Sequence, residues 1–224
     1  MEHKQKKYVL AAAILLVILS AAFISVLFLD PSGKFHSLPP IRVACVGDSI
    51  TQGTYYPSDL QILLGKNYAV RNYGASGRTV LLSADKPYMN GSAFQYAVAF
   101  EPQIVIIMLG TNDANPKYYP QIDNFTTDYK ILIASFEIYK PQIWLVLPPP
   151  IFNDSIGPNE ANLVQGVIPR IAQVATDLNL PTINVYSLFV GQPQYFWDGV
   201  HPGDLGAEII AKAVYLAISN RITP

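Results

Sequence analysis

The sequence predicts an α/β fold, in which helices on both sides cover a doubly wound parallel sheet of about five strands, preceded by one N-terminal transmembrane helix. Short apolar runs alternate along the chain with segments of helical periodicity. The runs are nearly continuous in Val, Ile and Leu, which is typical of parallel strands covered on both faces. A separate apolar stretch near the N-terminus is long enough to cross a bilayer.

The N-terminal apolar stretch covers residues 8–29 and contains no charged side chain. About 20 apolar residues span the hydrocarbon core of a bilayer. Three lysines lie within residues 1–7, and Asp30 follows the stretch. This charge bias predicts a cytoplasmic tail at 1–7, a signal-anchor at 8–29 and an extracytoplasmic location for the rest of the chain. The alternatives are a signal peptide cleaved near Ala22, which gives a secreted protein, or a buried helix of a soluble protein.

Residues 30–40 carry Pro, Gly and Ser without apolar periodicity, and we interpret them as a linker to a single domain at 41–224. The predicted strands of that domain are Ile41–Val46, Tyr68–Asn72, Ile104–Leu109, Ile143–Leu147 and, more weakly, Thr182–Tyr186. Helical patterns lie around Ser58–Leu64, Ser92–Phe100, Phe125–Tyr139, Asn159–Leu178 and Asp204–Ser219. Strands that alternate with helices imply βαβ units.

Composition argues against several classes of function. The formal net charge is −1, and Lys and Arg do not cluster beyond residue 7, so a nucleic-acid-binding surface is not expected. Cys45 is the one cysteine, which excludes an intrachain disulfide, and we interpret it as a small buried residue of the first strand. The predicted domain has one histidine and no Asp-rich loop, so no metal and no cofactor is expected.

Chemically useful side chains follow the predicted strands. Ligands of doubly wound folds bind beyond the carboxyl ends of the strands, and Ser49 directly follows the first of these ends. His201 is the one histidine of the predicted domain, and Asp198 lies in a turn three residues before it. A carboxylate there can accept the ring Nδ1–H, so that Nε2 can take a proton from a hydroxyl. The pattern predicts a triad of Ser49, His201 and Asp198, although Ser49 also suits a helix N-cap and His201 a structural turn.

Acyl transfer also needs hydrogen-bond donors for the oxygen that becomes negative. Gly74 follows the second strand, where the missing Cβ lets its N–H approach a substrate closely. Asn112 follows the third strand and offers a side-chain NH₂ group. Both residues are also common in turns without any catalytic role.

Four short motifs resemble the SGNH (GDSL-type) hydrolase family. They are Gly47-Asp48-Ser49, Asn72-x-Gly74-x-x-Gly77, Gly110-x-Asn112-Asp113 and Asp198-x-x-His201-Pro202, in the family's order. The resemblance covers most of the chain from Ile41 onward. It implies a three-layer, flavodoxin-like fold and ester hydrolysis without a cofactor. It also implies that Ser49 is the nucleophile and that an oxyanion hole is formed by the N–H groups of Ser49 and Gly74 and the Asn112 side chain.

The sequence gives the least information about the substrate. The spacing from Asn72 through Asn112 is similar to carbohydrate O-acetylesterases of the family, so we expect an acetyl ester of an extracellular or cell-envelope glycan. The alternatives are a lysophospholipase or thioesterase for longer acyl chains and an anchored glycan-binding module without turnover. Aromatic residues that could stack on a sugar, or merely pack, are Tyr88, Tyr118, Tyr119, Tyr195 and Trp197. Asn-x-Ser/Thr patterns at Asn90, Asn124 and Asn153 suit an outward-facing domain.

Overall fold

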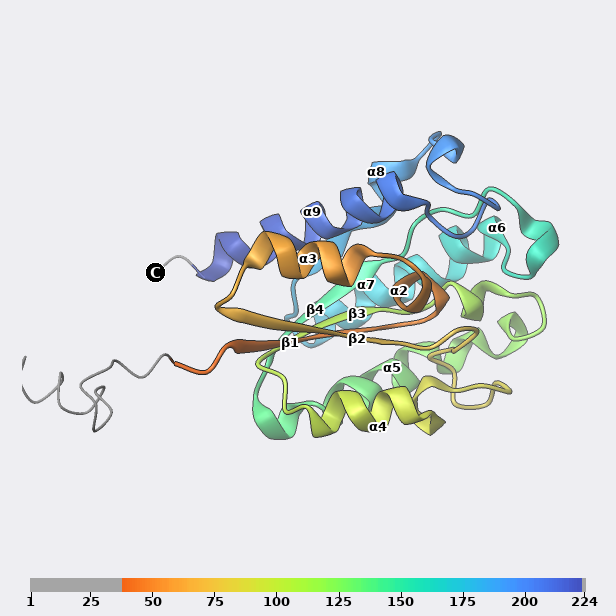
Figure 1. The fold of residues 1–224 in the computed structure, drawn as a ribbon. Coiled ribbons are helices and arrows are strands. Elements are labelled where there is room, and N and C mark those ends of the chain that lie inside the picture. The colour runs from red at the N-terminus through yellow and green to blue at the C-terminus, as the bar shows by residue number, and fades with distance from the viewer. Residues whose placement is uncertain (1–37, 223–224) are drawn as a thin grey trace, which may run out of the picture. The chain divides into compact units, whose positions relative to one another are not determined.

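The five predicted strands form one parallel sheet in the order β2-β1-β3-β4-β5 (Figure 1). A computed structural model describes residues 38–222 of the chain. The strands are β1 (Ile41–Gly47), β2 (Tyr68–Gly74), β3 (Ile104–Met108), β4 (Gln142–Leu147) and β5 (Thr182–Asn184). The chain runs outward from β1 to β2 and then in the opposite direction from β3 to β5, so the strand order reverses beside β1, where ligands of such sheets bind.

Helices cover both faces of this sheet, as the sequence predicts. Residues of α4 (Ser92–Ala99), α5 (Phe125–Ala134) and α7 (Ile168–Asp177) pack in the core of one face. Residues of α2 (Ser49–Gly53), α3 (Tyr56–Leu64), α8 (Val185–Phe189) and α9 (Asp204–Ile222) pack in the core of the other. Figure 1 shows α3 and α9 on one side of the strands and α4 and α5 on the opposite side. The result is a three-layer, flavodoxin-like α/β arrangement.

Single turns complete the secondary structure. A short helix, α6, covers Glu160–Asn162 and leads into a π-helical segment at Leu163–Val167. The 3₁₀ turns of the described residues are Tyr88–Asn90, Asn112–Ala114, Tyr119–Asn124, Glu137–Tyr139, Asp154–Ile156 and Pro193–Tyr195.

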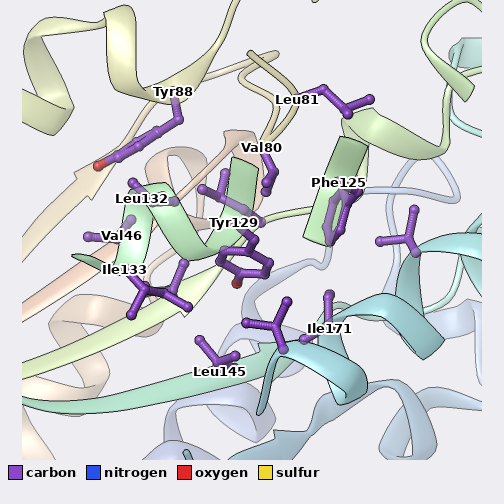
Figure 2. Close-up of a cluster of buried hydrophobic side chains, with 14 of the residues drawn as sticks. Val46, Val80, Leu81, Tyr88, Phe125, Tyr129, Leu132, Ile133, Leu145 and Ile171 are labelled. Carbon is purple, nitrogen blue, oxygen red and sulfur yellow. The ribbon is translucent and has the colours of Figure 1, made fainter. Parts of the chain in front are cut away.

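The apolar strands supply both cores because successive side chains of a strand point to opposite faces. In β1, Val43 and Cys45 lie in the core under α3 and α9, whereas Ala44 and Val46 lie in the core under α4, α5 and α7. Figure 2 shows this second core, in which Val46 is drawn with the side chains of α5 and α7. Cys45 is fully buried in its strand, which confirms its interpretation as a small core residue.

Two predicted helices are interrupted. The pattern at 125–139 forms α5 only as far as Ala134, after which the Phe136 N–H donates to the Ile133 carbonyl at 3.0 Å and the chain continues into the 3₁₀ turn at Glu137–Tyr139. Lys140 ends the region in the left-handed conformation, with φ of 49°. The pattern at 159–178 breaks into α6, the π-helical segment and α7. Pro169 lies at the start of α7 and has no N–H to donate to the preceding turn, which favours a boundary there.

The structure differs from the prediction in two further elements, the fifth strand and the helix α2. The fifth strand ends at Asn184, earlier than predicted, because the Asn184 side chain accepts the Ser187 N–H and begins α8. The short helix α2 was not among the predicted helices.

The predicted cytoplasmic tail and transmembrane segment lie outside the described residues, as does most of the predicted linker. Among residues 38–222, no helix is long and apolar enough to cross a membrane.

Candidate active site

The position of Ser49 is set by the end of β1. The chain leaves the strand at Gly47, where an added Cβ would lie 2.0 Å from Thr51 Oγ1, so only glycine lets α2 turn back so tightly. Asp48 is the N-cap of α2, and its Oδ1 accepts the Ile50 N–H at 2.9 Å. Ser49 is therefore the first residue of α2 rather than its N-cap, and its hydroxyl has no capping role.

The structure brings the three predicted triad residues together. His201 Nε2 lies 2.9 Å from Ser49 Oγ, and His201 Nδ1 lies 2.6 Å from Asp198 Oδ2. A quarter of the imidazole side chain remains exposed (25%), so a ligand can reach it. This arrangement lets the ring accept a proton from the hydroxyl on one side while the carboxylate holds it on the other.

Asp198 is oriented by the backbone of its own turn. Its Oδ1 accepts the N–H groups of Val200 at 2.9 Å and His201 at 2.7 Å. Partial burial raises the pKa of Asp198, but these two N–H groups and the imidazole outweigh it and hold the pKa below its usual value. The carboxylate is thus ionised at neutral pH, and Oδ2 is directed at the ring.

The turn is braced by the segment that follows β4. Phe152 N–H donates to the Gly199 carbonyl at 2.7 Å, and Asn153 Nδ2 donates to the Asp198 carbonyl at 3.0 Å. Gly199 has φ of 89°, and a Cβ there would lie 2.5 Å from Asn153 Cβ. Sequence reasoning identified Asn153 only as part of an Asn-x-Ser pattern, since nothing in the sequence links it to a turn 45 residues away.

The predicted oxyanion donors differ in their surroundings. Asn112 Nδ2 donates one hydrogen bond to the Arg78 carbonyl at 3.0 Å, which leaves one of its two N–H groups for another acceptor. The Gly74 N–H already donates to Asn72 Oδ1 at 2.9 Å. A Cβ at Gly74 would lie 2.2 Å from the Gln52 nitrogen, so packing of α2 on β2 accounts for this glycine. The geometry gives no support to the predicted role of Gly74.

The backbone N–H of Gly77, unlike that of Gly74, has no acceptor among the described residues. Gly77 adopts φ of 71°, a conformation that favours glycine. The adjacent Ser76 lines the pocket beside Ser49. Of the two glycines in the Asn72-x-Gly74-x-x-Gly77 motif, Gly77 therefore keeps an N–H group available to a ligand.

A pocket of about 290 Å³ opens beside the nucleophile. It is lined by Ser49, Gln52, Gly53, Thr54, Ser76, Trp197 and His201. The Trp197 indole stacks on the His201 ring, with 5.4 Å between ring centroids and 20° between planes. Of the aromatic residues considered from sequence, Trp197 alone lines this pocket, whereas Tyr88 is buried and donates its hydroxyl to the Tyr73 carbonyl.

Comparison with known proteins agrees with this fold. The GDSL-like lipase/acylhydrolase family matches residues 45–209. The acetylxylan esterase of Xylanibacter ruminicola is 34% identical over 206 residues, which cover 80% of this chain and 43% of that protein. The chain thus spans less than half the length of this curated relative.

Solved structures show the same fold. The lipase/acylhydrolase from Enterococcus faecalis superposes with a TM-score of 0.68 at 20% identity, over 82% of this chain and 98% of that one. A catalytic mutant of an acetylxylan esterase from Geobacillus stearothermophilus gives a TM-score of 0.63 at 21% identity, over 81% and 95% of the two chains. The chain belongs to the GDSL-like lipase/acylhydrolase family.

Two buried carboxyl groups lie next to the motif residues of this site. Asp48 precedes the nucleophile, and Asp113 follows Asn112 and accepts the N–H groups of Val80 at 3.1 Å and Leu81 at 2.8 Å. Burial raises the pKa of Asp48 to about 6 and that of Asp113 to about 7, and the hydrogen bonds they accept offset only part of this. Asp113 thereby ties the segment after β2 to the end of β3.

The raised pKa of Asp113 predicts a stability that falls with rising pH. Between the usual carboxyl pKa, 3.8, and about 7, this group is ionised in the unfolded chain but protonated in the folded one, so its contribution is lost across that range. Urea unfolding of wild type and Asp113→Asn from pH 4.5 to 7.5 measures this. We expect the free energy of unfolding of the variant to fall less with pH than that of wild type. Parallel curves would show that the Asp113 pKa is not raised.

Proposed function

We propose that the protein is a serine O-acetylesterase that removes acetyl groups from carbohydrate. Ser49 is the nucleophile, His201 the general base and acid, and Asp198 the residue that orients the imidazole. The observation that carries the proposal is the hydrogen-bonded series Ser49–His201–Asp198, with distances of 2.9 and 2.6 Å, at the wall of a small pocket.

The first chemical step is formation of an acyl-enzyme. His201 Nε2 removes the proton of the Ser49 hydroxyl as Oγ attacks the ester carbonyl carbon. The imidazolium that forms is stabilised by the ionised Asp198. When the tetrahedral intermediate collapses, the sugar oxygen leaves with the proton held by His201, and the acetyl group remains on Ser49.

The second step is hydrolysis of this acyl-enzyme. His201 removes a proton from water, which attacks the acetyl carbonyl, and then returns the proton to Ser49 Oγ as acetate leaves. Water reaches the ring by the same pocket, since a quarter of the His201 side chain is exposed (25%).

The negative oxygen of each tetrahedral intermediate needs donors fixed in advance. We assign this role to the Ser49 N–H, the second N–H of Asn112 Nδ2 and the Gly77 N–H, which takes the place predicted for Gly74. The hydrogen bond from Asn112 to the Arg78 carbonyl supports the grouping, because it joins the end of β3 to the loop that contains Gly77.

The character of the pocket supports a short acyl group on a polar alcohol. Its volume of about 290 Å³ is at the lower limit for small-molecule sites, and Gln52, Thr54 and Ser76 place polar groups beside a largely apolar surface. A lysophospholipase or long-chain thioesterase needs a long apolar channel for its acyl chain, which this lining does not provide. The likeness to an acetylxylan esterase points in the same direction. A binding module without turnover is not proposed, because the chain belongs to a family of ester hydrolases.

Hydrolysis of p-nitrophenyl acetate, butyrate and decanoate tests reaction and acyl preference together. We expect kcat/KM to fall from acetyl to decanoyl, because the residues around Ser49 form no long apolar channel for the longer chain. Ser49→Ala should lower kcat by about 10⁴-fold or more. Asn112→Ala should lower kcat by about 10²- to 10³-fold, since it removes one oxyanion donor.

Ser135→Ala is the matched control, because the Ser135 hydroxyl bonds only to the backbone at the end of α5. Its activity should equal that of wild type. Undiminished activity of Ser49→Ala would refute the assignment of the nucleophile, and a preference for decanoate would favour the long-chain alternative.

We further propose that residues 8–29 anchor the protein in a membrane, with residues 41–224 on the extracytoplasmic side. The uncharged apolar sequence and the preceding lysines support this. After alkaline carbonate extraction, the expressed full-length protein should remain with the membranes, and protease added to intact cells or spheroplasts should digest residues 41–224. Release of a shorter protein into the medium would instead indicate signal cleavage.

A further inference from the structure

We propose that the pocket beside Ser49 binds one neutral sugar ring, with Trp197 as its stacking surface and Gln52 as a specificity-determining hydrogen-bond donor. This inference rests on the proposed function and adds the residues that distinguish an acetylated sugar from a simple acetyl ester.

Trp197 lies beside His201 and has exposed aromatic surface. One side of the indole is stacked on the His201 ring, at 5.4 Å between centroids. The residue is nonetheless 72% exposed, so its remaining surface is open to the pocket and solvent. An exposed aromatic face beside a reacting group suits the apolar C–H face of a sugar ring.

Gln52 presents its amide in a fixed orientation. The Ser76 N–H donates to the side-chain oxygen of Gln52 at 2.7 Å, and an N–H group requires that this atom be Oε1. Nε2 is then the outer atom, and its two N–H groups have no acceptor in the described part of the chain. Since Gln52 also lines the pocket, these groups are available to a ligand hydroxyl or ring oxygen.

The remaining walls favour an uncharged ligand of modest size. None of the lining residues carries a permanent charge, which disfavours a phosphate-bearing lipid headgroup. The Thr54 hydroxyl donates to the Ile50 carbonyl at 2.8 Å, and Gly53 has open space around its Cα. An aromatic surface, a fixed amide and an open wall together suit a sugar ring that continues into a longer chain outside the pocket.

The test compares an acetylated sugar with an acetyl ester that has no sugar. The ratio of kcat/KM for acetylated methyl xyloside to that for p-nitrophenyl acetate should fall about 3- to 10-fold in Gln52→Met, because one hydrogen bond to the sugar is lost. The control is Gln103→Met, directly before β3 and away from the carboxyl ends of the strands, where Oε1 likewise accepts a backbone N–H, from Arg42 at 3.0 Å. Gln103→Met should keep the wild-type ratio.

Gln52→Glu separates recognition from support of the loop. A carboxylate oxygen can still accept the Ser76 N–H, but the donor toward the sugar is gone. The inference predicts the same fall in the ratio for Gln52→Glu as for Gln52→Met. A wild-type ratio in Gln52→Glu would show that Gln52 only supports Ser76, and an unchanged ratio in both variants would overturn its role. Absence of any activity in wild type would instead contradict the proposed function.

A binding measurement tests the stacking surface without turnover. The chain has two tryptophans, of which Trp144 is 4% exposed and Trp197 is 72% exposed, so iodide quenches chiefly the fluorescence of Trp197. Methyl xyloside should reduce this quenching in wild type and require a higher concentration to do so in Gln52→Met. Quenching that is unaffected by saturating methyl xyloside would contradict the proposed stacking.

Discussion

The hydrogen bond between Ser49 Oγ and His201 Nε2, at 2.9 Å, joins residues 152 positions apart in the chain. Much of the surrounding structure serves to make this contact possible. Gly47 lets the chain turn sharply into α2, which fixes the hydroxyl at the end of β1. Phe152 and Asn153 hold the backbone of the turn that carries the imidazole. Neither end would be placed to within hydrogen-bond distance without a rigid sheet between them.

Buried polar groups provide the second constraint on the site. Asp48 caps α2 and Asp113 holds the segment after β2, and each is almost wholly removed from water. Burial of a carboxyl group costs free energy, which its raised pKa expresses. The cost is offset by the apolar cores on both faces of the sheet, where the alternating side chains of β1 and its neighbours are buried. The free energy gained in these cores thus allows a buried carboxyl group to hold the loops that contain Gly77 and Asn112 in place.

Local sequence patterns were sufficient to predict the sheet and to predict that Ser49, Asp198 and His201 lie together. Apolar runs predict parallel strands because burial on both faces leaves few polar positions, and Asp198 and His201 are close in the sequence as well as in space. The contacts of Gln52 and Asn153 were not predictable in this way. They depend on hydrogen bonds between segments that only the folded sheet brings together, such as Gln52 with Ser76. Pro169 itself indicates a helix boundary within the predicted helix at 159–178. The apolar pattern continues on both sides of it and favours one uninterrupted helix.

Covalent labelling tests most directly whether His201 activates Ser49. The purified full-length protein is treated with a fluorophosphonate, which forms a stable bond to activated serine hydroxyls, and the adduct is located by peptide mass mapping. We expect a single adduct on Ser49, with labelling much slower in His201→Ala and absent from the urea-unfolded protein. A folded protein that is labelled at another serine, or at Ser49 with equal speed in His201→Ala, would contradict this expectation.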